Sequence, residues 1–566
     1  MGLSITGGYA GDGSMHSPDH LLNTTVRSLS PPPLAVAQSP ETLVTMPQAV
    51  PPQQVVGQFT CTRPTEDSLS MLGAQTPVAA SLDAELRSAI PAYVDVFWDK
   101  VDPFYPVTHK SIFERHFGAA PDHLDLLSCS MAALATQFLE DKDHRVSGGR
   151  LHAYVWESTK MFTQSEEWSL PIMHAVLLSE YYARFRGRQK ESHRPSARFA
   201  KLYQMVIDHQ NAFTPIPARG DSLSSWKQWV DRESRRRLLA GCFMLDVHSS
   251  VYYEQHPMAM HGLDYSSPFT LPIPLSASSR KLWGAPDDHA WGQLVGGCPP
   301  VETVGTALSK PLAPETIASM PPFDASILLA ASVLSLPRRR SLATVDATVA
   351  MAMDGPEFRL ATLFSQSGIA NTYMALHYTP LHVLLSVSGE SWVFNRKVGR
   401  ATLFSEHRKY LDEWCRSDQA VVAVVFAARA LKGLLGLSPG LAADGGVSLV
   451  EQMRGVPWRD ISDYWGVYVC ALICWAYGQG GAGEHGQDDA SRRTGLGWIL
   501  SASEMEPGQL AAWAPSRNTL AVVCLARDVL ARDCMGGRNI LFADSVGVLK
   551  KLGGRDGWRG VATMAP

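Results

Sequence analysis

The polar and apolar positions of residues 226–256, WKQWVDRESRRRLLAGCFMLDVHSSVYYEQH, predict one long helix in two parts. The first part carries charges of both signs. Asp231 with Arg235 and Glu233 with Arg237 are i,i+4 pairs in which the acid lies nearer the N-terminus, the more stabilising orientation. The spacing therefore predicts two ion pairs along the first half of this helix.

The second part, from Leu238 to Val247, is apolar on nearly every face and is broken only by Gly241 and Asp246. A helix that is apolar all round is a buried one. Pro257 disfavours the helical conformation of the residue before it, so we expect the helix to end there. An unpaired carboxylate inside such a run would be costly. We therefore predict that Asp246 is buried and paired with a basic residue from another helix or loop.

Apolar residues recur at helical spacing through most of the chain after residue 81. Tyr93, Phe97 and Val101 share one helical face, two prolines then predict an extended elbow, and Ser111 is a candidate cap for the next helix. Further helices are predicted over residues 124–139, 153–162, 171–185, 197–210, 323–336, 379–389, 407–435, 460–478, 516–533 and 539–552. No alternating pattern is long enough to predict a sheet. The predicted fold class is all-α, with one large helical domain over residues 81–560.

Four stretches interrupt this pattern. Residues 1–80 are dense in proline and poor in aromatic residues, so we predict a disordered segment. The proline-dense residues 257–322 predict a long excursion over the surface, and the glycine-rich residues 478–496 predict a flexible loop. The basic cluster at residues 184–195 is expected to form a loop between helices.

Composition narrows the class of protein. The chain has 566 residues, 45% of them hydrophobic, and a formal net charge of −4, which shows no preference for nucleic acid or acidic membranes. Its nine cysteines are scattered, with no secretory signal before them, as expected for free thiols in a reducing compartment. The longest apolar run, residues 465–478, is shorter than the roughly 20 residues needed to span a bilayer. We expect an intracellular, soluble protein with no membrane partner.

The elbow and several later segments resemble a known family. The elbow VFWDKVDPFYPVTHKSIF is similar to the opening of the fungal-specific transcription factor domain, through Phe97, Phe104, Pro106, His109 and Phe113. The long helix looks like the Glu-x-Arg-Arg…Leu-Asp helix of that domain. Similar later segments are LPIPLSASSRKLWGA, LLSVSGESWVF, DYWGVYVCALICWAYG and FADSVGVLKKL, so the resemblance extends over residues 82–552.

The resemblance implies an all-helical regulatory and oligomerisation module of nuclear transcription factors. On that basis we expect a nuclear regulator of RNA polymerase II genes, of the pathway-specific kind. Its expected partners are DNA, other transcription factors, and a second copy or a related chain in a homo- or heterodimer.

One departure from the family concerns zinc. The pattern resembles that of regulators that carry zinc fingers with two Cys and two His before this domain, and such a finger needs a closely spaced Cys pair followed by a His pair. His16 and His20 have suitable spacing, but Cys61 is the sole cysteine before Cys129. We therefore name no metal, cofactor, catalytic or DNA-binding residue, and expect zinc only if a finger module lies upstream. Two explanations stay open: the chain reaches DNA through a partner, or the gene model is truncated.

The remaining residues that could carry chemistry have both a structural and a functional interpretation. We expect Cys470 and Cys474, and likewise Trp226 and Trp229, to pack in the core. We expect His109 to have a hydrogen-bonded structural role. Residues 338–341 are expected to form a solvated loop, and the alternatives for them are a nuclear import signal or a phosphorylation site. The alternative functions are a terpene cyclase-like enzyme, for which the Asp pairs at 287–288 and 488–489 are the available acids, and a ligand-sensing helical module. No common catalytic motif is present, so we predict that the chain is not an enzyme.

Overall fold

The computed structural model describes residues 82–116, 120–139, 141–186, 194–211, 222–297, 299–337, 355–389, 392–393, 396–397, 401–438, 440, 449, 460–478, 489–534 and 540–553. These residues all belong to the compact unit Gln75–Pro566, and the other unit is Met1–Ala74. The segment 1–80, predicted to be disordered, lies outside the described residues.

The first group of helices leads into the predicted long helix. Its members are α2 (Ala84–Lys100), α3 (Lys110–Glu114), α4 (Pro121–Ala135), η1 (Thr136–Phe138), α5 (Lys142–Ser158), η2 (Thr159–Gln164), α6 (Leu170–Arg186), α7 (Ala197–Asn211) and α8 (Ser222–Tyr252). Helix α2 begins where the Asp83 carboxylate accepts the Leu86 N–H at 2.8 Å. Helix α4 begins with Pro121, whose fixed φ suits the first helical position. Helix α5 begins well before the predicted start at residue 153.

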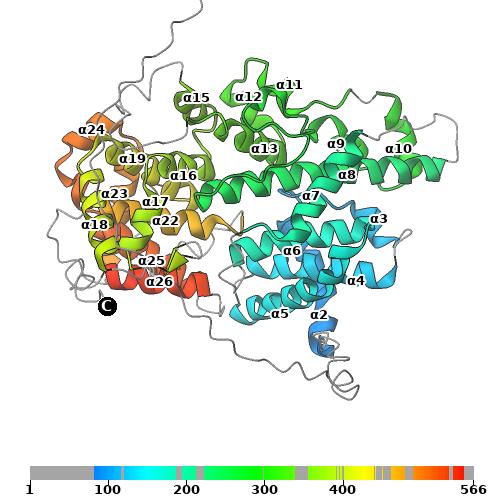
Figure 1. The fold of residues 1–566 in the computed structure, drawn as a ribbon, viewed down its shortest axis with the longest axis horizontal. Coiled ribbons are helices and arrows are strands. Elements are labelled where there is room, and N and C mark those ends of the chain that lie inside the picture. Colours follow the sequence, from blue (N-terminus) through cyan, green and yellow to red (C-terminus); the bar gives the residue numbers. More distant parts are fainter. Residues whose placement is uncertain are drawn as a thin grey trace, which may run out of the picture. The chain divides into compact units, whose positions relative to one another are not determined.

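Helix α8 confirms the predicted long buried helix, and α6, α7, α10, α13 and α16 contact it (Figure 1). Every residue from Arg237 to Ser250 is buried. The helix ends at Tyr252, earlier than Pro257 predicts. Two residues beyond its end, Glu254 has a left-handed φ of 50°, which breaks the helical path.

Both predicted ion pairs of α8 form, in different environments. Arg235 Nε lies 3.0 Å from Asp231 Oδ2, and the Asp231 side chain is 49% exposed. Arg237 Nε lies 3.0 Å from Glu233 Oε1, and both of these side chains are only 4% exposed. The Ser279 hydroxyl also donates to Glu233. The second pair therefore ties α8 to the proline-rich segment that follows it.

Asp246 is buried as predicted, but a different group satisfies it. Its Oδ2 accepts the backbone N–H of Met258 at 2.9 Å. Burial raises the pKa of Asp246 to about 6, and the charge of Arg184 on α6 acts in the opposite direction. The Arg184 guanidinium, however, makes its salt bridge with Glu180, at 3.2 Å. The basic residue predicted from another helix is therefore Arg184, which acts on Asp246 through its charge and makes its salt bridge elsewhere.

The elbow between α2 and α3 was predicted to be extended, but residues 101–104 form a turn in which the Val101 carbonyl oxygen accepts the Phe104 N–H at 3.0 Å. The cap of α3 also differs from the predicted one. The Nδ1 of His109 accepts the Ile112 N–H at 3.3 Å, so His109 and not Ser111 caps α3. Val101 and Val107 on either side of the prolines are buried. The elbow is thereby held against the core at both ends.

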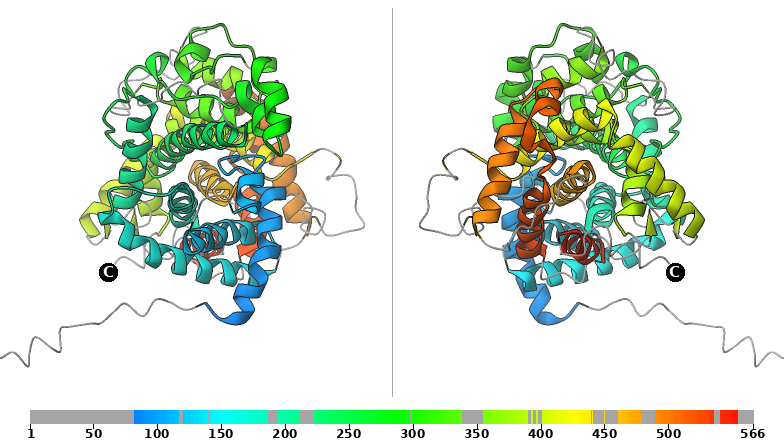
Figure 2. Two further views of the ribbon diagram at one scale, coloured as in Figure 1. Left: turned by 90° about the vertical axis from the view of Figure 1, so that its right-hand side faces the viewer. Right: turned by 90° about the vertical axis from the view of Figure 1, so that its left-hand side faces the viewer.

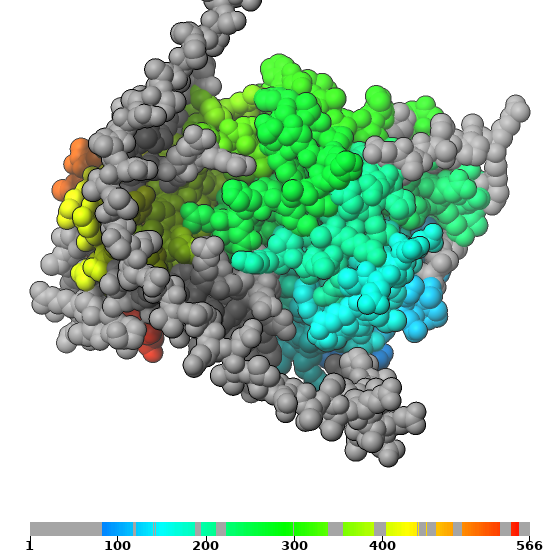
Figure 3. Space-filling view, viewed as in Figure 1, coloured from blue at the N-terminus to red at the C-terminus, as the bar shows by residue number. Residues whose placement is uncertain are grey.

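The proline-rich segment 257–322 is more ordered than the predicted excursion over the surface. It contains η4 (Pro268–Thr270), η5 (Ala277–Ser279), α9 (Arg280–Trp283), α10 (Asp288–Leu294), η6 (Val295–Gly297), α11 (Val304–Leu308) and α12 (Pro314–Ser319). Leu271 and Ile273 are buried, and the Asp324 carboxylate accepts the N–H groups of Ser276 and Ala277, each at 2.8 Å. In the space-filling view its green atoms are part of the continuous surface (Figure 3). Short apolar stretches between the prolines, such as Leu271 and Ile273, are buried in the core, which explains why this segment is ordered.

The second group of helices confirms the all-α fold class. Its members are α13 (Pro322–Val333), α15 (Pro356–Leu363), α16 (Gly368–His377), α17 (Leu381–Val387), α18 (Ala401–Trp414), α19 (Asp418–Leu434), α22 (Asp463–Tyr477), α23 (Asp489–Ser503), α24 (Pro507–Ala512), η9 (Ala514–Arg517), α25 (Leu520–Cys534) and α26 (Ile540–Leu552). Every residue of α22 is buried, and Figure 2 shows this helix, in gold, end-on among its neighbours.

Several elements of this group were not predicted. Helices α15, α16 and α24 are short, and α16 carries polar residues such as Asn371 and Thr372 inside the core. Helix α23 occupies part of the predicted loop 478–496, whereas residues 479–488 lie outside the described part of the chain. Strands β1 (Trp392–Val393) and β2 (Arg396–Lys397) form a small antiparallel hairpin.

We expect Glu233→Ala to lower the free energy of unfolding by about 3–5 kcal/mol, because it leaves the buried Arg237 without its carboxylate. Asp231→Ala is the matched control, since it removes the acid of the exposed pair at the same spacing and should cost about 0–1 kcal/mol. Denaturant unfolding followed by circular dichroism measures both. Equal losses would contradict the assigned difference in burial.

Asp246→Asn should change the pH dependence of stability. The folded-state pKa lies above the ordinary 3.8, so the folded protein holds this proton between about pH 4 and 6 while the unfolded chain releases it. Unfolding free energy therefore falls as pH rises through that window, by about 3 kcal/mol for this group. Asp246→Asn keeps an acceptor for Met258 but cannot ionise, so it should escape this loss.

The test is thermal or denaturant unfolding of both proteins at pH 4 and pH 7. The stability difference should shift toward the Asn variant as pH rises, and parallel profiles would refute the assignment. Asp246→Ala, which removes the acceptor as well, should lower the melting temperature sharply.

Candidate ligand-binding site

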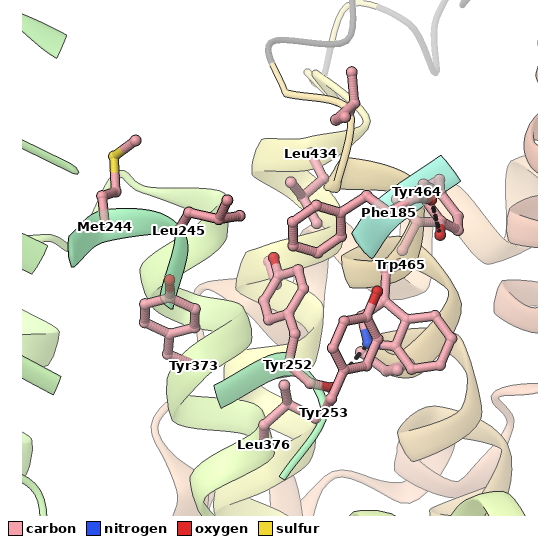
Figure 4. Close-up of a cluster of buried hydrophobic side chains, with 14 of the residues drawn as sticks. Phe185, Met244, Leu245, Tyr252, Tyr253, Tyr373, Leu376, Leu434, Tyr464 and Trp465 are labelled. Atoms are coloured by element: carbon pink, nitrogen blue, oxygen red, sulfur yellow. Dashed lines mark hydrogen bonds between the residues drawn. The ribbon is translucent and has the colours of Figure 1, made fainter. Parts of the chain in front are cut away.

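A cavity of about 600 Å³ lies beside the C-terminal half of α8. Its walls come from α6, α8, α12, α13, α15 and α16, and Asp460 closes one side just before α22. The walls are mostly apolar, with Met244 and Leu245 on α8 facing residues such as Ile317 on α12 and Leu329 on α13. Figure 4 shows Met244 and Leu245 on the same side of the core as Tyr373 of α16.

Aromatic packing fixes the end of α8 next to this cavity. The Tyr464 hydroxyl donates to the carbonyl oxygen of Phe185 at 2.5 Å, and the Trp465 Nε1–H donates to the carbonyl oxygen of Tyr252 at 3.0 Å (Figure 4). Tyr253 lies between these groups, with its ring 5.4 Å from that of Trp465. These bonds join α6, α8 and α22, three elements that supply or flank the cavity wall.

Polar groups converge on one part of the cavity, here called the polar floor: Tyr105, Tyr181, His248, Tyr373 and Asp460. The Tyr105 and Tyr181 hydroxyl oxygens lie 2.5 Å apart, and both hydroxyls are hydrogen-bonded to Asp460 Oδ2. Burial raises the pKa of Tyr105 and Tyr181 well above the ordinary value, and the charge of Asp460 adds to that effect. Both phenols are therefore protonated at neutral pH.

His248 connects the polar floor to α22. Its Nδ1 lies 2.5 Å from the Tyr373 hydroxyl and its Nε2 lies 2.8 Å from Ser462 Oγ. Burial lowers the pKa of His248 to about 4 against the opposing charge of Asp460. The imidazole is therefore neutral at pH 7, so one ring nitrogen donates and the other accepts.

The Ser462–His248 contact has the spacing of a nucleophile and its base, but the surroundings differ from those of a serine hydrolase. Ser462 is completely buried and does not line the cavity. The carboxylate of Asp460 accepts the Ser462 N–H at 2.7 Å, while the second imidazole nitrogen faces Tyr373. The pair thus presents no nucleophile to a molecule in the cavity.

The charges at the cavity are of one sign. Asp460 lies at the polar floor and the exposed Glu315 lies at the rim, while neither lysine nor arginine is among the described lining residues. Within the described part of the chain, no group of three or more His, Cys, Asp or Glu side chains is placed to hold a metal ion. The same part of the chain contains no helix with the length and apolarity to cross a membrane.

His109 has the structural role expected of it. It is buried, caps α3, and lies edge-on against Trp226 and Trp283, with ring centroids 5.7 and 4.8 Å away. Burial lowers its pKa to about 4, and the nearby Arg237 charge adds to this. His109 also lines a second cavity of about 370 Å³ beside α4 and α8. Trp226 is fully buried in a small cluster that Trp229 flanks, so the expected core role of both is confirmed.

The other residues singled out in the sequence are dispersed. Cys470 and Cys474 are buried free thiols in α22, and burial raises the pKa of Cys470 to about 12, in line with a packing role. Arg184 and Arg186 are buried in α6, so the predicted basic loop begins later than expected, and residues 187–193 lie outside the described part. Residues 338–341 also lie outside it.

The acids considered for a cyclase do not meet at the cavity. Asp287 caps α10 by accepting the Ala290 N–H at 2.9 Å, and Asp489 forms a salt bridge with Arg493 at 3.2 Å. Neither lines the 600 Å³ cavity, and Asp488 lies outside the described residues.

The polar floor is not predictable from the local pattern of the sequence. Tyr105 and Tyr181 are 76 positions apart, and Tyr181 and Asp460 are 279 apart, so no local spacing connects them. A weak signal was available in Asp460 and Asp463, two acids directly before the most apolar run of the chain.

Comparison with known proteins supports the family resemblance. Residues 94–306 match the family model described as the fungal specific transcription factor domain. The chain is also 23% identical over 230 residues to the nicotinate catabolism cluster-specific transcription factor of Emericella nidulans. That alignment covers 38% of this chain and 24% of the relative, so the chain matches about a quarter of the relative's length. No solved structure matches.

The elbow, the long helix and the Leu-Trp segment all lie inside the matched region, while the similarity predicted for residues 307–552 stays a prediction. The region 94–306 is therefore similar to the fungal specific transcription factor domain, which confirms the family resemblance found in the sequence.

Proposed function

We propose that this chain is a nuclear transcriptional regulator of RNA polymerase II genes that acts through its helical domain. The observation that carries the proposal is the match of residues 94–306 to the fungal specific transcription factor domain. The helices of that region are organised around α8, whose buried polar groups bind the elbow and the proline-rich segment.

The regulation we propose is of the pathway-specific kind. The similar protein of Emericella nidulans is named for a nicotinate catabolism cluster. We carry over the class of regulation and not the nicotinate target, because the alignment covers 24% of that protein.

We also propose that the chain reaches DNA through another protein, either a different transcription factor or a related chain in a dimer. The chain has 50 lysine and arginine residues against 54 acidic ones, so it lacks the positive charge that binds phosphates non-specifically. A non-catalytic role accords with the burial of Ser462, the serine hydroxyl that His248 contacts.

The first test brings the full chain to a promoter. We expect fusion of residues 1–566 to a heterologous DNA-binding domain to change reporter transcription severalfold, with the fusion located in the nucleus. The DNA-binding domain alone and the Glu233→Ala fusion, destabilised at the buried ion pair, are the controls. A nuclear, full-length fusion that leaves the reporter unchanged would sink the proposal.

The second test addresses DNA directly. We expect the purified 566-residue chain alone to produce no sequence-preferring shift of duplex DNA in a gel titration, because its net charge is −4. A salt-sensitive, sequence-preferring complex at nanomolar protein would show that the chain contains its own DNA-binding surface.

A further inference from the structure

We propose that the 600 Å³ cavity is a binding site for a small organic molecule with an apolar body and a hydrogen-bond-donating, non-anionic end, such as an amine or an alcohol. The apolar body would lie against Met244, Leu245 and Leu329, and the donating end would lie at the polar floor. Mostly apolar cavities of this size with a few convergent polar groups are typical of small-molecule sites.

The polar floor has more acceptors than donors. Tyr105, Tyr181 and Asp460 form three mutual oxygen–oxygen contacts, but the two hydroxyls supply only two protons. If both phenols donate to the carboxylate, the two phenol oxygens face each other with no proton between them. An N–H or O–H group from a bound molecule can donate to the remaining lone pair of a phenol oxygen that faces the cavity. A carboxylate end would add a further acceptor and be repelled.

Tyr373 can adjust to the bound group. When His248 Nδ1 donates to the Tyr373 oxygen, its Nε2 accepts the proton of Ser462, and the Tyr373 O–H is free to donate into the cavity. In the other tautomer, Tyr373 donates to Nδ1 and its oxygen can accept from the cavity. This adjustment lets one site take a hydroxyl, which both donates and accepts, as well as an amine.

The charges around the cavity also favour a ligand without a negative charge. Asp460 is 6% exposed, and the hydrogen bonds it accepts come from the neutral groups of Tyr105, Tyr181 and the Ser462 backbone. With Glu315 at the rim and neither lysine nor arginine among the described lining residues, the site favours a cation over a neutral molecule and a neutral molecule over an anion.

Four indoles of similar size separate these chemistries: tryptamine carries an ammonium group, tryptophol a hydroxyl, 3-ethylindole no added donor, and indole-3-acetate a carboxylate. Calorimetric titration of the purified 566-residue chain measures each dissociation constant. We expect tryptamine to bind most tightly, tryptophol next, and indole-3-acetate at least about tenfold more weakly than tryptamine, the scale of a charge-assisted hydrogen bond. Binding is measured on the protein alone, so the outcome is independent of the role in transcription.

Variants locate the binding. Ala318→Trp, at an exposed position on the rim in α12, should abolish tryptamine binding, whereas Ala511→Trp, at an exposed position of the short helix α24, should leave it unchanged. Asp460→Asn should remove the preference of tryptamine over tryptophol. If that variant does not fold, Ala318→Trp still decides the location. Equal binding of the amine and the acid, binding that survives Ala318→Trp, or no heat with any of the four indoles would each overturn the proposal.

Discussion

Burial of polar groups on α8 is the constraint on which the rest of the structure depends. A helix can lie inside a core only if the charged side chains on it meet partners, because an unpaired buried charge is expensive. Arg237 donates to the carbonyl oxygen of Pro106 in the elbow, at 3.0 Å. Asp246 accepts the N–H of Met258, and His248 bonds to Tyr373 and Ser462. Each partner comes from a different segment, so α8 fixes the positions of all of them.

The cavity follows from the same constraint. At its C-terminal end α8 contributes His248, whose two nitrogens engage α16 and the start of α22 on opposite sides of the ring. These bonds hold the two groups of helices at fixed positions while the apolar side chains of Met244 and Leu245 do not fill the space toward α12 and α13. The cavity between these hydrogen-bonded helices therefore has a defined shape, and the side chains of the polar floor are held in fixed orientations.

The sequence predicted the helices whose apolar positions form long periodic runs, and it predicted both ion pairs of α8 because their spacing is local. Burial of Asp246 was also predictable from its apolar neighbours, but its partner, a backbone N–H in the following loop, was not. Helix α16 was missed because its polar residues Asn371 and Thr372 bond back to its own backbone carbonyls, at 2.9 and 2.8 Å, which hides a buried helix behind a polar sequence. The polar floor could not be predicted, since its members meet only through tertiary packing.

The boundary of the family match at residue 306 lies inside α11 and divides the cavity lining. Tyr105, Tyr181 and His248 lie within the matched region, whereas Tyr373 and Asp460 lie beyond it. A comparison confined to the matched residues therefore covers only one wall. Recombination or drift in the segments after α11 can re-shape the opposite wall while the matched region stays intact, so part of the cavity lining can change without altering the similarity by which the domain is detected.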